Sequence, residues 1–198
     1  MLEFNDEKHE YRFDGRIVPS VSNILAPYMD FSKIPPQKLI DKQAWGNSVH
    51  LYLQEYDRGI LDYDAIDDVL DPEAPNIKQV VLKWDKFIDP YLEKHDTMKI
   101  EHQMYSSRMR YAGTADRIVG NTVIEIKTSL PRKAVGVQLA AYANLAHENR
   151  LIDSLDNVEL VSWHTNEQGV AKVKTWDYKE NWNIFMCLIT ALNFFNKE

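Results

Sequence analysis

The sequence predicts a mixed α/β fold in which a central β-sheet is flanked by helices. Three observations lead to this prediction. A helical part of the chain precedes several short β-rich segments, and a helix, two further strands and a final helix follow them. Gly120-Asn121 separates two of the β-rich segments, as in a two-residue hairpin turn. A stretch near residues 75–94 carries apolar residues three and four positions apart, which is typical of a helix packed on a core.

Residues 1–198 are expected to form a single domain with an N-terminal helical part. A chain of 198 residues with 44% hydrophobic content is long enough to bury one substantial core. The sequence contains no run of proline, glycine or serine of the kind that links two domains.

Local signals predict the order of the elements. Asp14-Gly15 favours a tight hairpin, and a serine soon after it is a suitable N-cap for a short helix. Apolar spacing predicts helices over residues 36–59 and 75–94. The remaining pattern predicts strands at 98–106, 109–119 and 122–128, a helix at 134–149, strands at 158–164 and 170–176, and a helix at 180–196.

The charges of the chain are unevenly distributed. The net charge of −7 argues against a surface coated for nucleic-acid binding. Residues 55–73 carry eight acidic side chains and one arginine, whereas residues 99–133 carry seven Lys or Arg and three acids. We interpret the acidic stretch as a solvated loop or short helix, and the basic stretch as the surroundings of a functional site.

Cysteine content and the N-terminal segment indicate the compartment. Cys187 is the single cysteine of the sequence, so an internal disulfide and a cysteine-based zinc or iron–sulfur site are not expected. The first residues have neither an apolar signal core nor an Arg-rich amphipathic presequence. No apolar run approaches the ~20 residues that a membrane span needs. We therefore expect a cytoplasmic protein that does not enter a membrane.

The hairpin around Gly120-Asn121 brings two carboxylates together. If its ladder is regular, Asp116 lies opposite Glu125, and Thr114 lies opposite Lys127. Directly opposed side chains have Cβ atoms roughly 5 Å apart, and like charges placed so are destabilising. Side chains alternate along a strand, so Lys127 shares the face of Glu125 and could offset part of this cost.

This polar cluster has the composition of a metal site. Divalent cations such as Mg²⁺ prefer oxygen ligands, which Asp116, Glu125 and the backbone carbonyl of Ile126 could supply. Lys127 could then orient the attacking water or stabilise charge on a phosphoryl group. The alternative is a solvent-exposed strand face with a salt bridge and no catalytic role.

The order of these residues resembles the PD-(D/E)XK nuclease motif. Asp116 is followed by Glu125 and Lys127 with one residue between the last two. Gln138 and Tyr142, four residues apart on a predicted helix, resemble the QxxxY motif of the RecB-like branch of that superfamily.

Two segments near the N-terminus extend the resemblance. Residues 45–50, WGNSVH, resemble the helix with a G-x-x-x-H motif that supplies a further metal ligand in the RecB-like branch, which implies this role for His50. Residues 11–25 are similar to the N-terminal segment of phage exonucleases and of the mitochondrial genome maintenance exonuclease. Ala115 stands where the motif has proline, which removes no ligand.

The resemblance implies a metal-dependent DNA exonuclease with a restriction-endonuclease-like core and a preference for single-stranded ends. The implied cofactor is Mg²⁺ or Mn²⁺, and no iron–sulfur cluster is expected because the required cysteines are missing. Arg117 is added as a contact to the DNA backbone because it lies beside the proposed site. The expected roles are catalysis by Asp116, Glu125 and Lys127, metal binding by His50, Asp116, Glu125 and the Ile126 carbonyl, and nucleic-acid binding by Gln138, Tyr142 and Arg117.

The expected biological setting is DNA repair or recombination in a bacterial cell or a phage-infected host. The chain has no room for helicase motifs, so a helicase or recombination partner would be a separate protein. A structure-selective or restriction-type endonuclease is the alternative enzyme. A non-catalytic nucleic-acid-binding protein with the same fold is a further alternative, which the intact Asp116, Glu125 and Lys127 disfavour.

Overall fold

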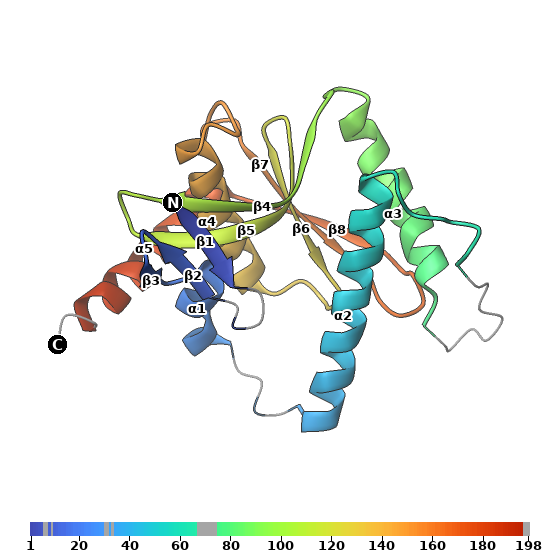
Figure 1. Ribbon diagram of the computed structural model, residues 1–198, viewed down its shortest axis with the longest axis horizontal. Coiled ribbons are helices and arrows are strands. Elements are labelled where there is room, and N and C mark those ends of the chain that lie inside the picture. Colours follow the sequence, from blue (N-terminus) through green and yellow to red (C-terminus); the bar gives the residue numbers. More distant parts are fainter. Residues whose placement is uncertain (6–7, 9, 30–31, 33, 67–74, 196–198) are drawn as a thin grey trace.

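The computed structural model of the protein describes residues 1–198 except 6–7, 9, 30–31, 33, 67–74 and 196–198 (Figure 1). Its elements follow the predicted order closely. They are β1 (Leu2–Asn5), β2 (Glu10–Phe13), β3 (Arg16–Val18), α1 (Val21–Leu25), the 3₁₀-helix η1 (Ala26–Tyr28), α2 (Pro36–Asp57), α3 (Ile77–Leu92), β4 (Met98–Ser106), β5 (Tyr111–Val119), β6 (Thr122–Lys127), α4 (Lys133–Glu148), β7 (Glu159–His164), β8 (Lys172–Trp176) and α5 (Tyr178–Phe195).

The central sheet has five strands in the order β4-β5-β6-β7-β8. Neighbouring strands are antiparallel except β6 and β7, which are parallel. The parallel pair is joined by α4, because a parallel connection needs a crossover element. The predicted mixed α/β fold with a flanked central sheet is therefore confirmed.

Helices cover both faces of this sheet (Figure 1). On one face, α1, α4 and α5 pack on a core that includes Ile118, Val123 and Leu160. On the other face, α2 and α3 pack on a core that includes Ile124 and Trp163. The alternation of side chains along β6 separates the two cores, since Val123 and Ile124 point to opposite faces.

A second sheet of three strands, in the order β1-β2-β3, precedes the helices. The predicted turn at Asp14-Gly15 joins β2 and β3, with φ values of 48° and 76° in the left-handed region. Strand β1 is an element that the sequence did not predict. The small sheet is held to the central sheet by a 2.6 Å hydrogen bond between the hydroxyl groups of Tyr11 and Thr114.

Helix α1 begins at the predicted serine cap. The Ser20 side chain accepts a hydrogen bond from the Asn23 amide, and the Asn23 side chain accepts from the Ser20 amide, so two free N–H groups are satisfied. The preceding carbonyl of Pro19 accepts from the Ala112 amide at 3.0 Å. These contacts fix α1 against β5.

The hairpin of β5 and β6 keeps the predicted register only near its turn. Pairing runs from Val119–Thr122 to Arg117–Ile124 and stops there. The predicted ladder pair of Asp116 with Glu125 is therefore wrong. The reason is that Asp116 Oδ2 accepts the amide hydrogen of Ile126 at 2.7 Å, so the carboxylate replaces the backbone in this part of the ladder.

The pairing predicted further along this hairpin, Thr114 with Lys127, is also wrong. The β5–β6 ladder ends at Arg117, and Thr114 pairs only on the other side of β5, with Gln103 of β4. Both Thr114 and Lys127 nevertheless line one cavity, together with Asp116 and Glu125. The expected polar cluster is thus present, although irregular backbone rather than a regular ladder assembles it.

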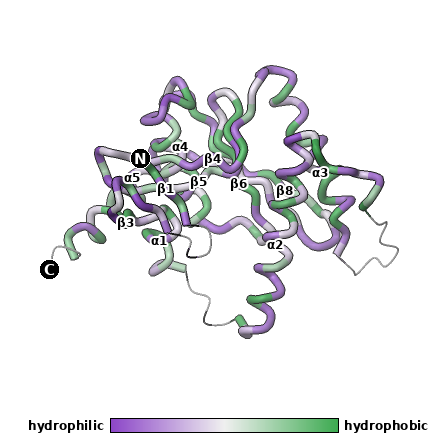
Figure 2. Tube along the Cα trace, viewed as in Figure 1, coloured by the Kyte–Doolittle hydropathy of each residue, from purple (hydrophilic) through white to green (hydrophobic). Residues whose placement is uncertain are grey.

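Helix α2 is hydrophilic along much of its length (Figure 2). Val49 and Leu53 are its buried residues. At Gly46, an added Cβ would lie 3.3 Å from Thr128 Oγ1, so the missing side chain allows the segment after β6 to approach closely. This contact fixes the distance between α2 and the end of β6.

The acidic stretch at residues 55–73 is only partly a solvated segment. Its first part forms the end of α2, and residues 67–73 lie outside the described part of the chain. Asp57 at this helix end is buried with a 1% exposed side chain, which corrects the prediction that it is solvated. Within the described residues, no helix is long and apolar enough to cross a membrane.

Candidate metal centre

The predicted site residues gather around a cavity of about 190 Å³. Segments from the small sheet, α1, α2, the central sheet and α4 all contribute to its wall. Its lining residues are Tyr11, Ser20, Val21, Ser22, His50, Glu101, Gly113, Thr114, Asp116, Glu125, Lys127, Gln138 and Tyr142.

Within this cavity, His50, Glu101 and Asp116 form a cluster that could hold a metal ion. One potential ligand atom from each of the three lies within 4.8 Å of the other two. His50 Nδ1 is 3.7 Å from Glu101 Oε1 and 3.7 Å from Asp116 Oδ1. A nitrogen and two carboxylates suit a divalent transition ion such as Mn²⁺, and the carboxylates also suit Mg²⁺.

Each of the three ligands is positioned by a different local feature. His50 lies on α2 one turn after Gly46, whose contact with Thr128 holds the helix near the sheet. Asp116 uses Oδ2 for the Ile126 amide, and its other oxygen, Oδ1, is the one near His50. Glu101 has φ of 47°, a left-handed conformation in the middle of β4. Such backbone strain is costly for a non-glycine residue and is concentrated at functional sites.

Glu101 is the ligand that sequence reasoning left out of the site. The register of β4 on β5 pairs Ile100 with Arg117 and His102 with Ala115, which places Glu101 across from Asp116. Pairing arithmetic applied to this second hairpin was the signal that could have found it.

Arg117 is a buried structural cation and not a surface contact. Its side chain is 0% exposed, so the prediction that it touches a DNA backbone is wrong. Nε donates to Asp57 Oδ2 at 2.5 Å, and Nη1 donates to Glu101 Oε1 at 3.0 Å and to the Asp116 carbonyl at 2.7 Å. One guanidinium therefore orients two residues of the metal cluster.

The network continues from Arg117 into the core behind the site. Trp84 of α3 donates its indole N–H to Asp57 Oδ1 at 2.7 Å. The Arg117 guanidinium carbon also lies 5.7 Å from the centre of the Trp84 ring. Helices α2 and α3 are thus tied to β5 by side chains that also position Glu101.

Glu125 and Lys127 complete the cavity as predicted from their shared strand face. Lys127 Nζ donates to Glu125 Oε1 at 2.5 Å. Glu125 is 2% exposed, and its other oxygen, Oε2, has no hydrogen-bond partner among the described residues. A buried carboxylate oxygen without a partner is costly, and a cation in the cavity would satisfy it. The residues present therefore fit a metal ion, whereas direct ligation by Glu125 and by the Ile126 carbonyl remains a prediction.

Burial and mutual repulsion shift the proton affinities of the acids. Burial raises the pKa of Glu125 to about 7, and the charge of Asp116 adds to the effect. Burial also raises the pKa of Asp116, although His50 opposes the shift. For Glu101, burial is outweighed by the hydrogen bond and charge of His50, so its pKa is lowered.

For the two basic groups, burial and the neighbouring acids have opposing effects on the pKa. Burial acts to lower the pKa of Lys127, but the charges of Glu125 and Asp116 outweigh it and raise the pKa. Burial likewise acts to lower the pKa of His50, and Asp116 and Glu101 raise it overall. Without a bound cation, the carboxylates of the cavity therefore favour the protonated forms of Lys127 and His50.

Gln138 and Tyr142 lie together on α4, facing the cavity. Gln138 Nε2 donates to the Tyr142 hydroxyl at 3.0 Å. The Tyr142 side chain is 5% exposed, and its ring lies so close to Gly113 that an added Cβ there would be 2.6 Å from Cε1. The ring packs on β5, so the nucleic-acid contact predicted for Tyr142 cannot be stacking of this ring on a base. A nucleic-acid contact by Gln138 remains a prediction.

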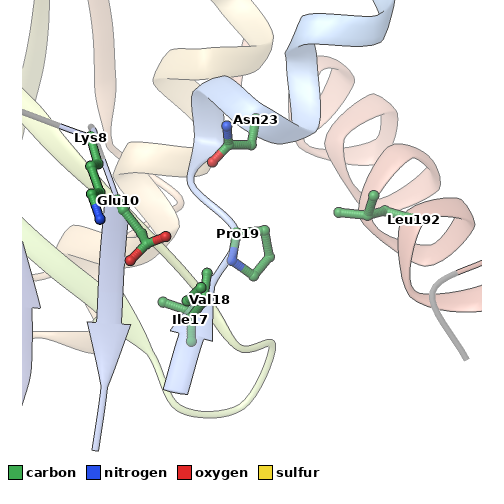
Figure 3. Close-up of a pocket in the computed structure, with 7 residues that line it drawn as sticks. All are labelled: Lys8, Glu10, Ile17, Val18, Pro19, Asn23 and Leu192. Carbon is green, nitrogen blue, oxygen red and sulfur yellow. The ribbon is translucent and has the colours of Figure 1, made fainter. Parts of the chain in front are cut away.

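A separate cavity of about 490 Å³ lies between β2, β3, α1 and α5 (Figure 3). Lys8 and Glu10 are the charged residues among its described lining residues, and Leu192 lies on the opposite side. Glu10 there is paired with Arg12 at 2.8 Å. With one acid, already paired, this cavity offers no set of metal ligands.

The Arg117 network predicts a large stability effect. Arg117→Met should lower the free energy of unfolding by about 3–5 kcal/mol, because Asp57 and Glu101 would keep buried charge without their partner. The effect can be measured by urea denaturation. In the double variant Arg117→Met/Asp57→Asn, part of this loss should be recovered, and additive effects of the two substitutions would contradict the proposed coupling.

Glu125 predicts a pH dependence of stability in the absence of metal. Its pKa of about 7 in the folded protein exceeds the ordinary value of 4.5, so the stability that it contributes is present below pH 4.5 and lost as the pH rises through 7. Glu125→Gln cannot ionise. Its stability relative to the wild type should therefore increase between pH 5 and pH 8, by up to about 3 kcal/mol. Urea denaturation in EDTA measures this difference, and a difference independent of pH would refute the assignment.

Comparisons with known proteins show a distant structural similarity. No protein-family model matches the chain, and no curated protein matches its sequence. The chain is similar to the crystal structure of a protein named "Putative exonuclease" from Eubacterium rectale, with 11% sequence identity and a TM-score of 0.47. The similarity covers 73% of this chain and 63% of that chain, so this chain spans less than two thirds of that protein. The function must therefore be argued from the site residues.

Proposed function

We propose that the protein is a metal-dependent deoxyribonuclease that hydrolyses phosphodiester bonds, acting as an exonuclease on single-stranded DNA ends. One observation carries the proposal: the His50–Glu101–Asp116 cluster and the Glu125–Lys127 pair line the same cavity. The motif resemblance of Asp116, Glu125 and Lys127 supports it independently, because it was recognised from the order of residues alone. Residues 1–198 are proposed to act as one nuclease domain.

The chemistry divides between the cluster and the lysine. His50, Glu101 and Asp116 would hold Mg²⁺ or Mn²⁺, and the unpartnered Glu125 Oε2 supplies a further oxygen. When bound, such an ion polarises a phosphoryl oxygen and lowers the pKa of bound water.

Lys127 is suited to stabilising charge. Burial acts to lower its pKa, but the charges of Glu125 and Asp116 raise it overall, which favours the protonated ammonium. Its hydrogen bond to Glu125 holds the charge beside the carboxylates of the cavity, where a phosphoryl group would gain negative charge in the transition state. The proposal therefore assigns Lys127 to charge stabilisation and not to deprotonation of the water.

The preference for single-stranded ends rests on the size and position of the cavity. It measures about 190 Å³ and is bounded on several sides by the small sheet, α1, α2 and α4. A duplex is stiff over ~150 base pairs and cannot bend into so small a space. A flexible single strand can bring a terminal phosphodiester into it.

The rival functions make different demands on this site. An endonuclease, structure-selective or of the restriction type, needs an open approach to internal phosphodiesters. A non-catalytic nucleic-acid-binding protein does not need the ion-binding cluster and the lysine in one cavity.

Removing the proposed functional groups should remove cleavage. Asp116→Asn, Glu125→Gln and Lys127→Ala should each reduce hydrolysis at least about 100-fold, because each removes charge stabilisation that the transition state requires. The assay is cleavage of end-labelled single- and double-stranded DNA with Mg²⁺, Mn²⁺ or EDTA. Lys83→Ala, at an exposed position on α3, is the control and should cleave like the wild type. Wild-type turnover by any folded site variant would overturn the assignment.

Substrate topology separates exonuclease from endonuclease. Linear single-stranded DNA should be degraded progressively from an end, blunt duplex should be cut poorly, and covalently closed single-stranded circles should survive. Gel analysis of matched linear and circular strands of one sequence measures this. Equal rates on circles and linear strands would replace the exonuclease proposal by the endonuclease alternative.

A further inference from the structure

We propose a second anion site beside the metal cavity, which holds a backbone phosphate of the bound DNA strand through Lys42 and Lys172. This inference rests on the proposed function and deepens it, since it assigns a path to the substrate. Arg117, the cation expected to meet the DNA backbone, is buried, so that contact must come from other residues.

The proposed site is a cavity of about 340 Å³ at the end of β6 and β7. Two lysines and several hydroxyl or amide groups line it, and no Asp or Glu is among its described lining residues. These lining residues are Lys42, Thr128, Ser129, Leu130, His164, Thr165, Asn166, Val170 and Lys172. Lysine, hydroxyl and amide groups are the side chains that commonly contact phosphate.

The two lysines are not neutralised by neighbouring acids. Both are exposed, and neither has an ion pair within 4.0 Å among the residues that the structure describes. By contrast, Lys127 and Arg117 are paired with carboxylates. The chain as a whole is negative, with a net charge of −7. A cavity with two such lysines and no acid among its described lining residues is a positive region that would attract a polyanion.

This cavity lies close enough to the metal cluster for one DNA strand to reach both. Lys42, Gly46 and His50 follow one another at four-residue intervals and therefore share one face of α2. His50 follows Lys42 by eight positions, which corresponds to about 12 Å along the helix axis. Between these ends, Gly46 contacts Thr128, which lines the second cavity and directly follows Lys127.

The wall of the second cavity is held in place by hydrogen bonds to β7. The Ser129 carbonyl can only accept, so His164 Nδ1 donates to it at 2.6 Å. His164 Nε2 is then free to accept from the Ser162 hydroxyl at 2.8 Å. The Thr165 amide donates to the Lys127 carbonyl at 2.8 Å. The loop after β6 is thus fixed to β7, and the start of the loop after β7 is fixed to Lys127 of β6. A phosphate held there would therefore be placed relative to the metal cluster.

Binding of single-stranded DNA without metal tests the proposal. The probe is a fluorescent oligothymidylate in EDTA, titrated at several salt concentrations. Each phosphate contact contributes about 0.7 to the slope of log K against log salt, which corresponds to about eightfold in affinity at 50 mM salt. Lys42→Gln and Lys172→Gln should each show losses of this size. Lys42→Arg, Lys172→Arg and the control Lys83→Gln should bind within about twofold of the wild type.

A neutral linkage in the strand locates the contact. A single methylphosphonate, moved along the oligonucleotide, should weaken wild-type binding at one position, and that loss should be absent in the Lys42→Gln/Lys172→Gln variant. Equal methylphosphonate effects in both proteins would overturn the inference.

A calorimetric titration with inorganic phosphate tests whether the site binds free phosphate rather than a phosphate of the DNA backbone. Phosphate binding lost in the variant, with unchanged DNA affinity, would show a site for free anions and also overturn it.

The outcomes separate this inference from the proposed function. If the wild type neither binds nor cleaves single-stranded DNA, the proposed nuclease function fails and the inference fails with it. If the wild type cleaves DNA and the lysine variants bind and cleave it equally well, the inference alone fails. The supporting result is cleavage with a raised KM and an unchanged kcat in the variants, since the lysines lie outside the reacting centre.

Discussion

The arrangement of the site depends on one buried cation, the guanidinium of Arg117. It has no access to solvent and is balanced by Asp57 at the end of α2 and by Glu101 in β4. Removing a charged group from water is costly, and the loss of either partner would leave the other charge buried and unpaired. Helix α2, strand β4 and strand β5 are therefore held at fixed distances, and His50, Glu101 and Asp116 come from these same elements.

The charges around the cavity are balanced incompletely without a metal ion. Four carboxyl groups, from Asp57, Glu101, Asp116 and Glu125, surround two permanent cations and one histidine. Burial and then the charge of Asp116 raise the pKa of Glu125, and its buried Oε2 has no hydrogen-bond partner among the described residues. A bound divalent cation would relieve both. The unfavourable interactions of the site are therefore the repulsion between its carboxylates and the left-handed backbone of Glu101. The cores on either side of the sheet are apolar.

Sequence patterns predicted the elements well and individual contacts less well. Helix periodicity and turn residues depend on near neighbours, so helices α2 to α5, strands β4 to β8 and the turn at Gly120-Asn121 followed from the sequence. Burial of Arg117 and the packing of the Tyr142 ring depend on elements far away in the chain. A charged residue in a basic stretch was interpreted as exposed, because nothing local reveals that Asp57, sixty positions earlier, is its partner.

The wall of the cavity beside the metal cluster can be completed only late in the synthesis of the chain. The wall takes Tyr11 from the small sheet, His50 from α2 and Tyr142 from α4, so segments made early and late must meet. A chain emerges from the ribosome N-terminus first. Until α4 has emerged and packed on β5, the early segments have no partner to close the cavity. The cavity therefore closes only after Tyr142 has emerged, although the residues of the His50–Glu101–Asp116 cluster are all made earlier.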